Sequence, residues 1–334
     1  MLWMKAISVC FSAIAMAAAP AVEAHGAPSD STIDATAPVI SVSPILLSAP
    51  DRGQDLQLRV SAPVSGRSLP VILFAHGFRE SSDSYAPLAN FWAARGFVVI
   101  QPSFLDSDMA GLAPDDPRTP MIWRFRVEDM RRILDRLDTV EKAVPGLAGR
   151  IDKDRIAAVG HSYGGITTAM LIGTRVIGPD GSVGEDLSDS RIKVGVLLST
   201  AGKGGSDLSA FAAANFPFMN PDFDQMRRPT LVVAGDKDQS PLTVRGPDWF
   251  TDPYTLSPGD KCLITLFGGE HMLGGISGRH VTETTDENPT RVAAVQELSL
   301  AYLRSALYPK DHVWADSRKA FEAKADRVGR IECK

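Results

Sequence analysis

The residues with the clearest chemical meaning form one motif near the middle of the chain, Gly160-His161-Ser162-Tyr163-Gly164-Gly165. The motif follows a short apolar run, 156–159, and precedes a helix-forming stretch, 166–172. A serine at a sharp strand-to-helix turn adopts strained backbone geometry, and neighbouring glycines remove side chains that would clash there. Because such a turn raises the hydroxyl above the sheet edge, we predict that Ser162 is a nucleophile.

A serine hydroxyl needs a neighbouring base, and histidine suits this role because its ordinary pKa is about 6.5. His271 lies in the segment Gly268-Gly269-Glu270-His271-Met272, directly after the apolar run 263–267. The carboxyl ends of buried strands are where α/β sheets place their chemistry. We therefore predict His271 as the general base, with His280 as the alternative. The other histidines belong to the N-terminal leader, to another motif, to the serine turn itself and to the region after the last core helix: His25, His76, His161 and His312.

The imidazole in turn needs an acid that holds its tautomer and stabilises its positive charge. The apolar run 230–234 ends in Gly235-Asp236-Lys237-Asp238. Asp236 comes directly after the glycine, where a short acidic side chain often closes a turn. We favour Asp238 because it lies further out, closer to a loop from the neighbouring strand. The sequence leaves Asp236 open as the alternative.

A second loop supplies hydrogen-bond donors for the negative charge that acyl transfer develops on a carbonyl oxygen. The segment Phe74-Ala75-His76-Gly77-Phe78 ends another apolar run, and Gly77 lets the backbone approach closely. We predict that the backbone N–H groups of Phe78 and Tyr163 form the oxyanion hole. We expect His76 to hydrogen-bond within its loop rather than to act as a base.

The elements that position these residues are read from hydrophobic patterns. Continuous apolar runs are typical of strands buried on both faces of a parallel sheet. Six such runs occur, at 71–74, 97–100, 156–159, 194–198, 230–234 and 263–267. Before them, 39–47 and 55–61 predict a hairpin around Pro50-Asp51-Arg52-Gly53. Helices are expected over 121–140, from an apolar face, and after Asn288-Pro289, which is a helix-start signal.

Strands that alternate with helices over short connections indicate an α/β fold with a mostly parallel central sheet flanked by helices. No connection is long enough to form a large cap domain. We therefore expect one domain over residues 39–334.

The order nucleophile, acid, histidine, each after its own strand, resembles the α/β-hydrolase superfamily. Within it, the chain is similar to the chlorophyllase, platelet-activating-factor acetylhydrolase and dienelactone-hydrolase-like esterases over about Pro70 to Leu307. The matching segments are His76-Gly77-Phe78, Ala94-Arg95-Gly96-Phe97-Val98-Val99-Ile100 and Gly160-His161-Ser162-Tyr163-Gly164-Gly165. The resemblance implies a Ser162–Asp238–His271 triad that hydrolyses a carboxylic ester. Dienelactone hydrolases carry cysteine at the position of Ser162, and chlorophyllases usually have a residue other than Tyr163.

These residues predict a serine hydrolase that cleaves carboxylic esters, either small molecules or polymers, through an acyl-enzyme. A serine peptidase of the same fold and a non-catalytic binding protein are the alternatives. The short connections favour an open site, unless the segment 199–229 folds over the serine. Trp249 and Met272, in loops after Asp238 and His271, are candidates for a substrate pocket.

The chemistry expected of Ser162 requires no cofactor, and no zinc-binding spacing of His and Cys occurs, so we expect no metal site. The formal net charge is -5, with 35 Lys+Arg against 40 Asp+Glu, which disfavours nucleic-acid binding. The sequence does not predict the oligomeric state.

The N-terminus has the pattern of a secretory signal peptide. Lys5 precedes an apolar run to Ala19, and Val22-Glu23-Ala24 suits signal peptidase. Pro20 and Glu23 interrupt the run too early for a membrane anchor. We expect a signal peptide over 1–24, a flexible leader over 25–38, and a secreted or periplasmic protein without stable membrane insertion.

Two cysteines remain after the predicted cleavage, Cys262 and Cys333. An even pair in an exported chain predicts a disulfide that ties the C-terminus to the sheet. The alternative is a buried Cys262 beside a free terminal thiol.

Overall fold

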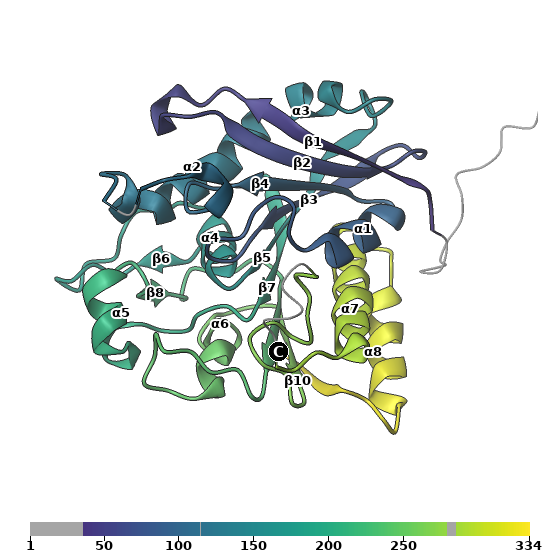
Figure 1. Cartoon of the computed structure of the whole chain (residues 1–334). Coiled ribbons are helices and arrows are strands. Elements are labelled where there is room, and N and C mark those ends of the chain that lie inside the picture. Colours follow the sequence, from purple (N-terminus) through teal and green to yellow (C-terminus); the bar gives the residue numbers. More distant parts are fainter. Residues whose placement is uncertain (1–35, 114, 279–284) are drawn as a thin grey trace, which may run out of the picture. The chain divides into compact units, whose positions relative to one another are not determined.

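The six apolar runs form the parallel centre of a nine-stranded sheet in this computed structural model (Figure 1). The strand order is β1-β2-β4-β3-β5-β7-β9-β10-β11. Every neighbouring pair from β4 to β10 is parallel, whereas β1, β2 and β11 run antiparallel to their neighbours. The strands are β1 (Val39–Leu47), β2 (Leu56–Pro63), β3 (Leu69–Ala75), β4 (Val98–Ser103), β5 (Ile151–His161), β7 (Ile192–Leu198), β9 (Thr230–Gly235), β10 (Lys261–Leu266) and β11 (Gly329–Cys333). The predicted mostly parallel α/β sheet is confirmed.

The structure describes residues 36–113, 115–278 and 285–334. The predicted signal peptide and most of the predicted leader lie outside these ranges, as does His280. In the described part of the chain no helix is long and apolar enough to cross a membrane.

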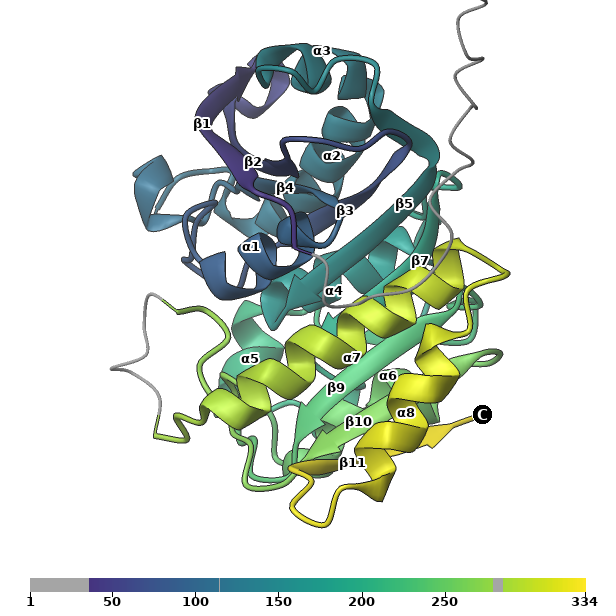
Figure 2. The same cartoon turned by 90° about the vertical axis from the view of Figure 1, so that its right-hand side faces the viewer.

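Helices cover both faces of the sheet, because its strands are apolar on both sides. They are α1 (Ala86–Ala94), α2 (Ile122–Asp135), α3 (Leu137–Ala143), α4 (Tyr163–Leu171), α5 (Ala210–Asn215), α6 (Asp252–Thr255), α7 (Pro289–Leu307) and α8 (Val313–Ala323). One hydrophobic core contains buried side chains of α2, α3 and α4, and a second contains those of α1, α7 and α8. Figure 2 shows α7 and α8 lying across the strands of the second face.

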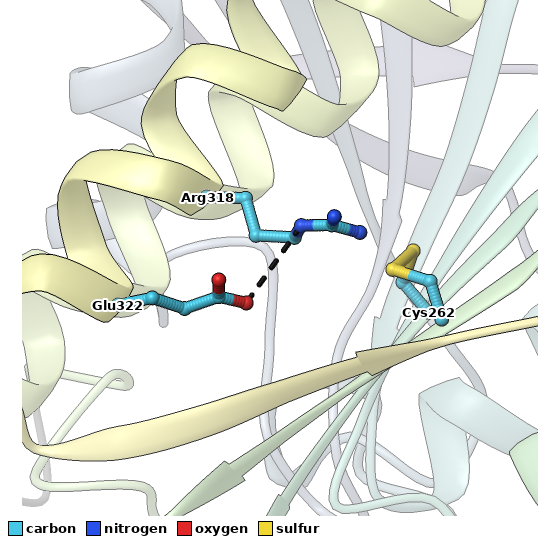
Figure 3. Close-up of a disulfide and its surroundings, with 4 residues drawn as sticks. Cys262, Arg318 and Glu322 are labelled. Carbon is cyan, nitrogen blue, oxygen red and sulfur yellow. Dashed lines mark ion pairs between the residues drawn. A yellow bond between two sulfur atoms is a disulfide. The ribbon is translucent and has the colours of Figure 1, made fainter.

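The two edges of the sheet close differently. At one edge β1 and β2 form the predicted hairpin, and Gly53 has a positive φ of 80° at the end of its turn. At the other edge β11 pairs with β10, so that Cys262 lies opposite Cys333 and the two form a disulfide. Figure 3 shows this disulfide beside Arg318 and Glu322, an ion pair on α8 whose guanidinium points toward the sulfur atoms. The predicted bond between the two cysteines is therefore present.

Two predictions about helices need comparison with the structure. The helix after Asn288-Pro289 is confirmed, and the Asn288 side chain accepts a hydrogen bond from the Arg291 N–H, as a helix cap does. The single helix expected over 121–140 is wrong: α2 ends at Asp135 and α3 begins at Leu137. The backbone leaves helical geometry at Arg136 (φ −118°, ψ 20°), while the buried side chains of α2 and α3 still face the same core.

Candidate active site

Ser162 lies between the end of β5 and the start of α4, at the carboxyl edge of the sheet. Its backbone has φ 54° and ψ −119°, a strained conformation for a residue with a side chain. The Ser162 N–H donates to the carbonyl oxygen of Leu198 at the end of the adjacent β7, at 2.9 Å. The strained turn that the motif predicts is therefore held by the neighbouring strand.

Two glycines in the motif are required by close backbone approach. A Cβ on Gly160 would lie 2.1 Å from the carbonyl oxygen of Gly164. A Cβ on Gly164 would lie 2.0 Å from the carbonyl oxygen of Ala75, the last residue of β3. Any larger residue would push α4 away from the strands, because such distances lie far inside van der Waals contact.

Three side chains, which follow the ends of β5, β9 and β10, meet in a continuous hydrogen-bonded chain. The Ser162 Oγ lies 2.9 Å from the His271 Nε2. The His271 Nδ1 lies 3.1 Å from both carboxylate oxygens of Asp238. The Asp238 side chain is fully buried, whereas the His271 side chain is 37% exposed. This arrangement places a base against the hydroxyl and orients that base through its other ring nitrogen.

The alternative acid, Asp236, has a different role in the structure. Its Oδ1 accepts a hydrogen bond from the Gly268 N–H at 2.7 Å, which ties the loop after β9 to the loop after β10. This is the turn-closing role that its position after Gly235 favours. His271 therefore contacts Asp238 and not Asp236.

The loop that carries His271 is held on two sides. Asp286, a nearly buried residue, accepts hydrogen bonds from the N–H groups of Glu270 and Gly274, at 2.6 and 3.1 Å. On the other side, the His161 Nε2 donates to the carbonyl oxygen of His271 at 2.8 Å. The imidazole of His271 is thus positioned by contacts to its own backbone as well as by Asp238.

His161 and Tyr85 form a buried link that the sequence analysis did not identify. Since the His161 Nε2 donates to a carbonyl, its Nδ1 accepts, and the Tyr85 hydroxyl lies 2.8 Å from it. The Tyr85 oxygen also accepts the Gly77 N–H at 3.2 Å. Burial, and then the nearby His271, lower the pKa of His161 to about 3, so it stays neutral at ordinary pH. The link joins the loop after β3 to the loop after β10, and no local motif at Tyr85 signals it.

The two predicted oxyanion donors lie at the ends of adjacent strands. Phe78 follows β3, Tyr163 opens α4 after β5, and β3 pairs with β5. Their rings lie 6.3 Å apart. In the described part of the chain, neither backbone N–H donates to a protein acceptor. Both donors are therefore available to a substrate oxygen, and the N-terminus of α4 adds its partial positive charge at the same place.

One predicted pocket residue does not line an open surface. Trp249 is only 1% exposed, and its indole N–H donates to the carbonyl oxygen of Lys203 at 2.7 Å. It packs in the core because the large ring has an internal partner for its polar atom. Met272, the other candidate, is partly buried next to His271. The ring of Phe250, the next residue, lies 5.6 Å from that of His271.

A row of aromatic rings begins at Tyr163, the residue that follows the serine. Tyr163 stacks on Phe218 at 5.5 Å, and Phe218 stacks on Trp123 at 5.9 Å. Phe78, at the near end of the row, is 57% exposed. Phe218 belongs to the segment 199–229, so this segment packs against Tyr163, the residue that follows Ser162. Ring stacking holds one residue of this segment against the residue that follows the nucleophile, and the expectation of an open site stays a prediction.

Comparison with known proteins agrees with this architecture. A model of the alpha/beta hydrolase family matches residues 72–328, which include all three residues of the hydrogen-bonded chain. A search of curated proteins finds no significant match. The match extends over more than half of the chain and coincides with the sheet described above, so the chain belongs to the alpha/beta hydrolase family.

Proposed function

We propose that this hydrolase cleaves carboxylic esters with Ser162 as the nucleophile, His271 as the general base and Asp238 as the acid that orients the base. The observation that carries the proposal is the unbroken series of hydrogen bonds from the serine hydroxyl to a buried carboxylate. A serine with this partner set is activated for attack on a carbonyl carbon, and a hydrolase-fold protein without catalytic function would have no need of the set.

The reaction proceeds in two halves. The Ser162 Oγ attacks the ester carbonyl while its proton passes to the His271 Nε2, and the oxygen that becomes negative lies against the Phe78 and Tyr163 N–H groups. Collapse of this intermediate breaks the ester C–O bond, and the proton on His271 passes to the departing alcohol. Water then gives a proton to His271 and attacks the acyl carbon. Collapse of this second intermediate breaks the bond between the acyl carbon and the Ser162 Oγ, His271 returns the proton to that oxygen, and the carboxylic acid leaves.

The direct test replaces the nucleophile and follows turnover of p-nitrophenyl butyrate. Ser162→Ala should lower kcat by at least about 1,000-fold, because the hydroxyl forms the covalent bond. Ser182→Ala, a change on an exposed loop, should leave turnover unchanged and serves as the matched control. A fluorophosphonate should label the peptide that contains Ser162 in the wild-type protein only. Full activity of Ser162→Ala would refute the proposal.

A parallel panel distinguishes the bond that is cleaved. Esters of increasing acyl length, a polyester film and a phospholipid form one arm, and a peptide library forms the other. We expect turnover in the ester arm. Turnover of peptides with none of esters would favour the peptidase of the same fold, and labelling of Ser162 would still be expected in that case.

We further propose that the protein is exported. The proposal is supported by the signal-like pattern that ends near Ala24 and by the Cys262–Cys333 disulfide, since such bonds persist in oxidising compartments. N-terminal sequencing of the mature protein from the medium or periplasm should begin near His25. An intact Met1 in a cytoplasmic fraction would contradict export.

A further inference from the structure

Arg126 is a fully buried cation close to the predicted oxyanion hole. It lies on α2, its side chain has no exposed surface, and its Nε and Nη2 each donate to Asp106 at 2.8 Å. A buried charge is costly unless it is paired and fully hydrogen-bonded. The hydrogen bonds that Arg126 makes beyond Asp106 therefore indicate which part of the site the buried cation stabilises.

Those donors reach the loop that carries Phe78. The Arg126 Nη1 donates to the carbonyl oxygen of His76 at 2.9 Å, and the Nη2 donates to that of Gly77 at 3.1 Å. The Gly77 oxygen also accepts from the His76 Nδ1 at 2.6 Å and from the Glu80 N–H at 3.3 Å. This single carbonyl thus has three donors, one of them a full positive charge.

The Gly77 carbonyl belongs to the same peptide unit as the Phe78 N–H. A trans peptide is planar, and its C=O and N–H point in opposite directions. When Arg126 and His76 fix the oxygen on one side, they also fix the direction of the N–H on the other. A cation at the oxygen also draws electron density from the peptide, which makes its N–H a stronger donor.

The same guanidinium contacts the second donor residue. The Arg126 Cζ lies 4.2 Å from the centre of the Tyr163 ring, a cation–π distance. It also lies 4.4 Å from the centre of the Phe104 ring. The ring of Tyr163 is therefore held against the cation that holds the Gly77–Phe78 peptide.

We propose that Arg126 is a positioning residue of the oxyanion hole, which orients and polarises the Gly77–Phe78 peptide and holds Tyr163 beside it. The proposal rests on the ester hydrolysis proposed above. It assigns Arg126 no contact with substrate: the cation acts through the two residues whose N–H groups receive the oxyanion.

The neighbours of Arg126 keep this arrangement neutral overall. Burial would raise the pKa of Asp106, but the charge and hydrogen bonds of Arg126 outweigh it and lower that pKa, so the carboxylate stays ionised. Burial, and then Arg126, lower the pKa of His76 to about 3. The His76 Nε2 accepts the Phe104 N–H at 3.1 Å, which leaves its Nδ1 to donate to Gly77. His76 therefore adds a hydrogen bond to the loop without adding a second charge.

The test is Arg126→Lys, which keeps the charge but cannot donate to Asp106 and two carbonyls in one plane. We expect kcat for p-nitrophenyl butyrate to fall about 10- to 100-fold, less than when an oxyanion donor is deleted outright, with KM changed less than threefold. Each kcat is calculated per active site, with the concentration of active sites measured by fluorophosphonate labelling, so that unfolded protein is excluded. Asp106→Asn weakens the hydrogen bonds that hold the same guanidinium, so it should also lower kcat. This variant replaces Arg126→Lys in the test if Arg126→Lys does not fold.

The matched control is Arg52→Lys. Arg52 is also a buried arginine, 1% exposed, and it pairs with Asp129 of the same helix α2 at 3.2 Å. It contacts neither the loop after β3 nor Tyr163. We expect this variant to lose stability while its kcat per reactive site stays within twofold of wild type.

A second readout separates oxyanion binding from general damage. An alkylboronic acid forms a B–O bond with Ser162 while the serine proton passes to His271, and the tetrahedral adduct places an oxygen in the oxyanion hole. Its inhibition constant should rise in Arg126→Lys by the same factor by which kcat/KM falls. Unchanged kcat and boronate affinity, or a change in KM alone, would overturn the proposal. If the wild-type protein hydrolyses no ester, the proposed function fails instead.

Discussion

At the scale of single residues, the pairing of His271 with Asp238 rests on where each aspartate lies relative to the turn after β9. Asp236 is used within that turn, on the Gly268 N–H, while Asp238 is fully buried against the imidazole. The sequence favours this choice because Asp236 suits the turn and Asp238 lies further out, toward a loop from the neighbouring strand. The distance between the loops after β9 and β10 is a tertiary property that no local pattern contains.

Asp238→Asn should leave the fold intact and lower kcat by about 1,000- to 10,000-fold. An amide at this position can donate to the Nδ1 and so favours the wrong tautomer of His271. Ester turnover of the purified variant, with Tm as the check on folding, measures the effect. Asp236→Asn is the matched control and should change kcat less than about tenfold. If Asp236→Asn had the larger effect on kcat with Tm preserved, the assignment of Asp238 would be wrong.

At the scale of elements, the aromatic row joins three parts of the chain that are distant in sequence. Tyr163 begins α4, Trp123 lies in α2, and Phe218 comes from the connection between β7 and β9. The sequence shows an aromatic patch in that connection but not what it packs against. Because the row begins at the residue that follows Ser162, we predict that it favours substrates with a planar apolar group.

Phe218→Ala should raise KM for an aryl ester such as p-nitrophenyl benzoate by about 3- to 10-fold, since an aromatic contact contributes about 0.5–1.5 kcal/mol. Turnover of p-nitrophenyl acetate, whose acyl group is small, should change less. Phe267→Ala, a partly exposed phenylalanine outside the row, is the control. Equal changes for both esters would mean that the ring acts only in packing.

The strand pattern was more predictable than the helix boundaries. A strand buried on both faces is a continuous apolar run, so the strands of the parallel centre can be read from composition over a few residues. The break at Arg136 has no glycine or proline to signal it. The short β6 (Arg175–Val176) and β8 (Pro221–Asp222) pair only with each other, and two residues are too few for a pattern.

At the scale of the whole molecule, the disulfide lies at the opposite end of strand β10 from the loop that carries His271. Cys262 is near the start of β10, whereas His271 follows the end of that strand. The bond links positions with a sequence separation of 71 and holds β11 on the sheet. It should contribute to stability without taking part in catalysis.

Replacing both cysteines by alanine should lower the free energy of unfolding by about 2–4 kcal/mol, because the open chain gains entropy when it unfolds. Denaturant unfolding measures this loss. The value of kcat at 25 °C should stay within about twofold. Reductant should destabilise the wild type to the same degree and leave the double variant unaffected. A large loss of kcat in a folded double variant would contradict the expectation that the disulfide takes no part in catalysis.

Acid should destabilise the protein through its two buried neutral histidines. The pKa values of His76 and His161 are lowered to about 3, so below pH ~6.5 the unfolded state binds protons that the folded state does not. Each histidine therefore removes about 1.4 kcal/mol of stability per pH unit as the pH falls from ~6.5 to ~3. Above pH ~6.5 the histidine is neutral in both states and removes no stability.

Asp129 acts in the opposite direction. Burial, which outweighs the charge of Arg52, raises its pKa to about 7, so the folded state takes up this proton before the unfolded state does. Urea unfolding of the wild type and of His76→Asn from pH 7 to 4.5 is the test. Both proteins contain Asp129, so its contribution to the pH dependence cancels when the two are compared. The variant should show the smaller loss of stability with acid, and equal slopes would contradict the neutral state of His76.

The sequence by itself determined the sheet and predicted the candidate chemistry: apolar runs typical of buried strands, a serine motif after one of them, and a histidine and an aspartate after two others. These are local signals, written within a few neighbouring residues. Only the tertiary structure decided that Asp238 faces His271, that Phe218 stacks on Tyr163, and that Arg126 hydrogen-bonds to the carbonyl of the Gly77–Phe78 peptide. Those contacts join residues from different elements, and their geometry depends on how the helices and loops pack on the sheet.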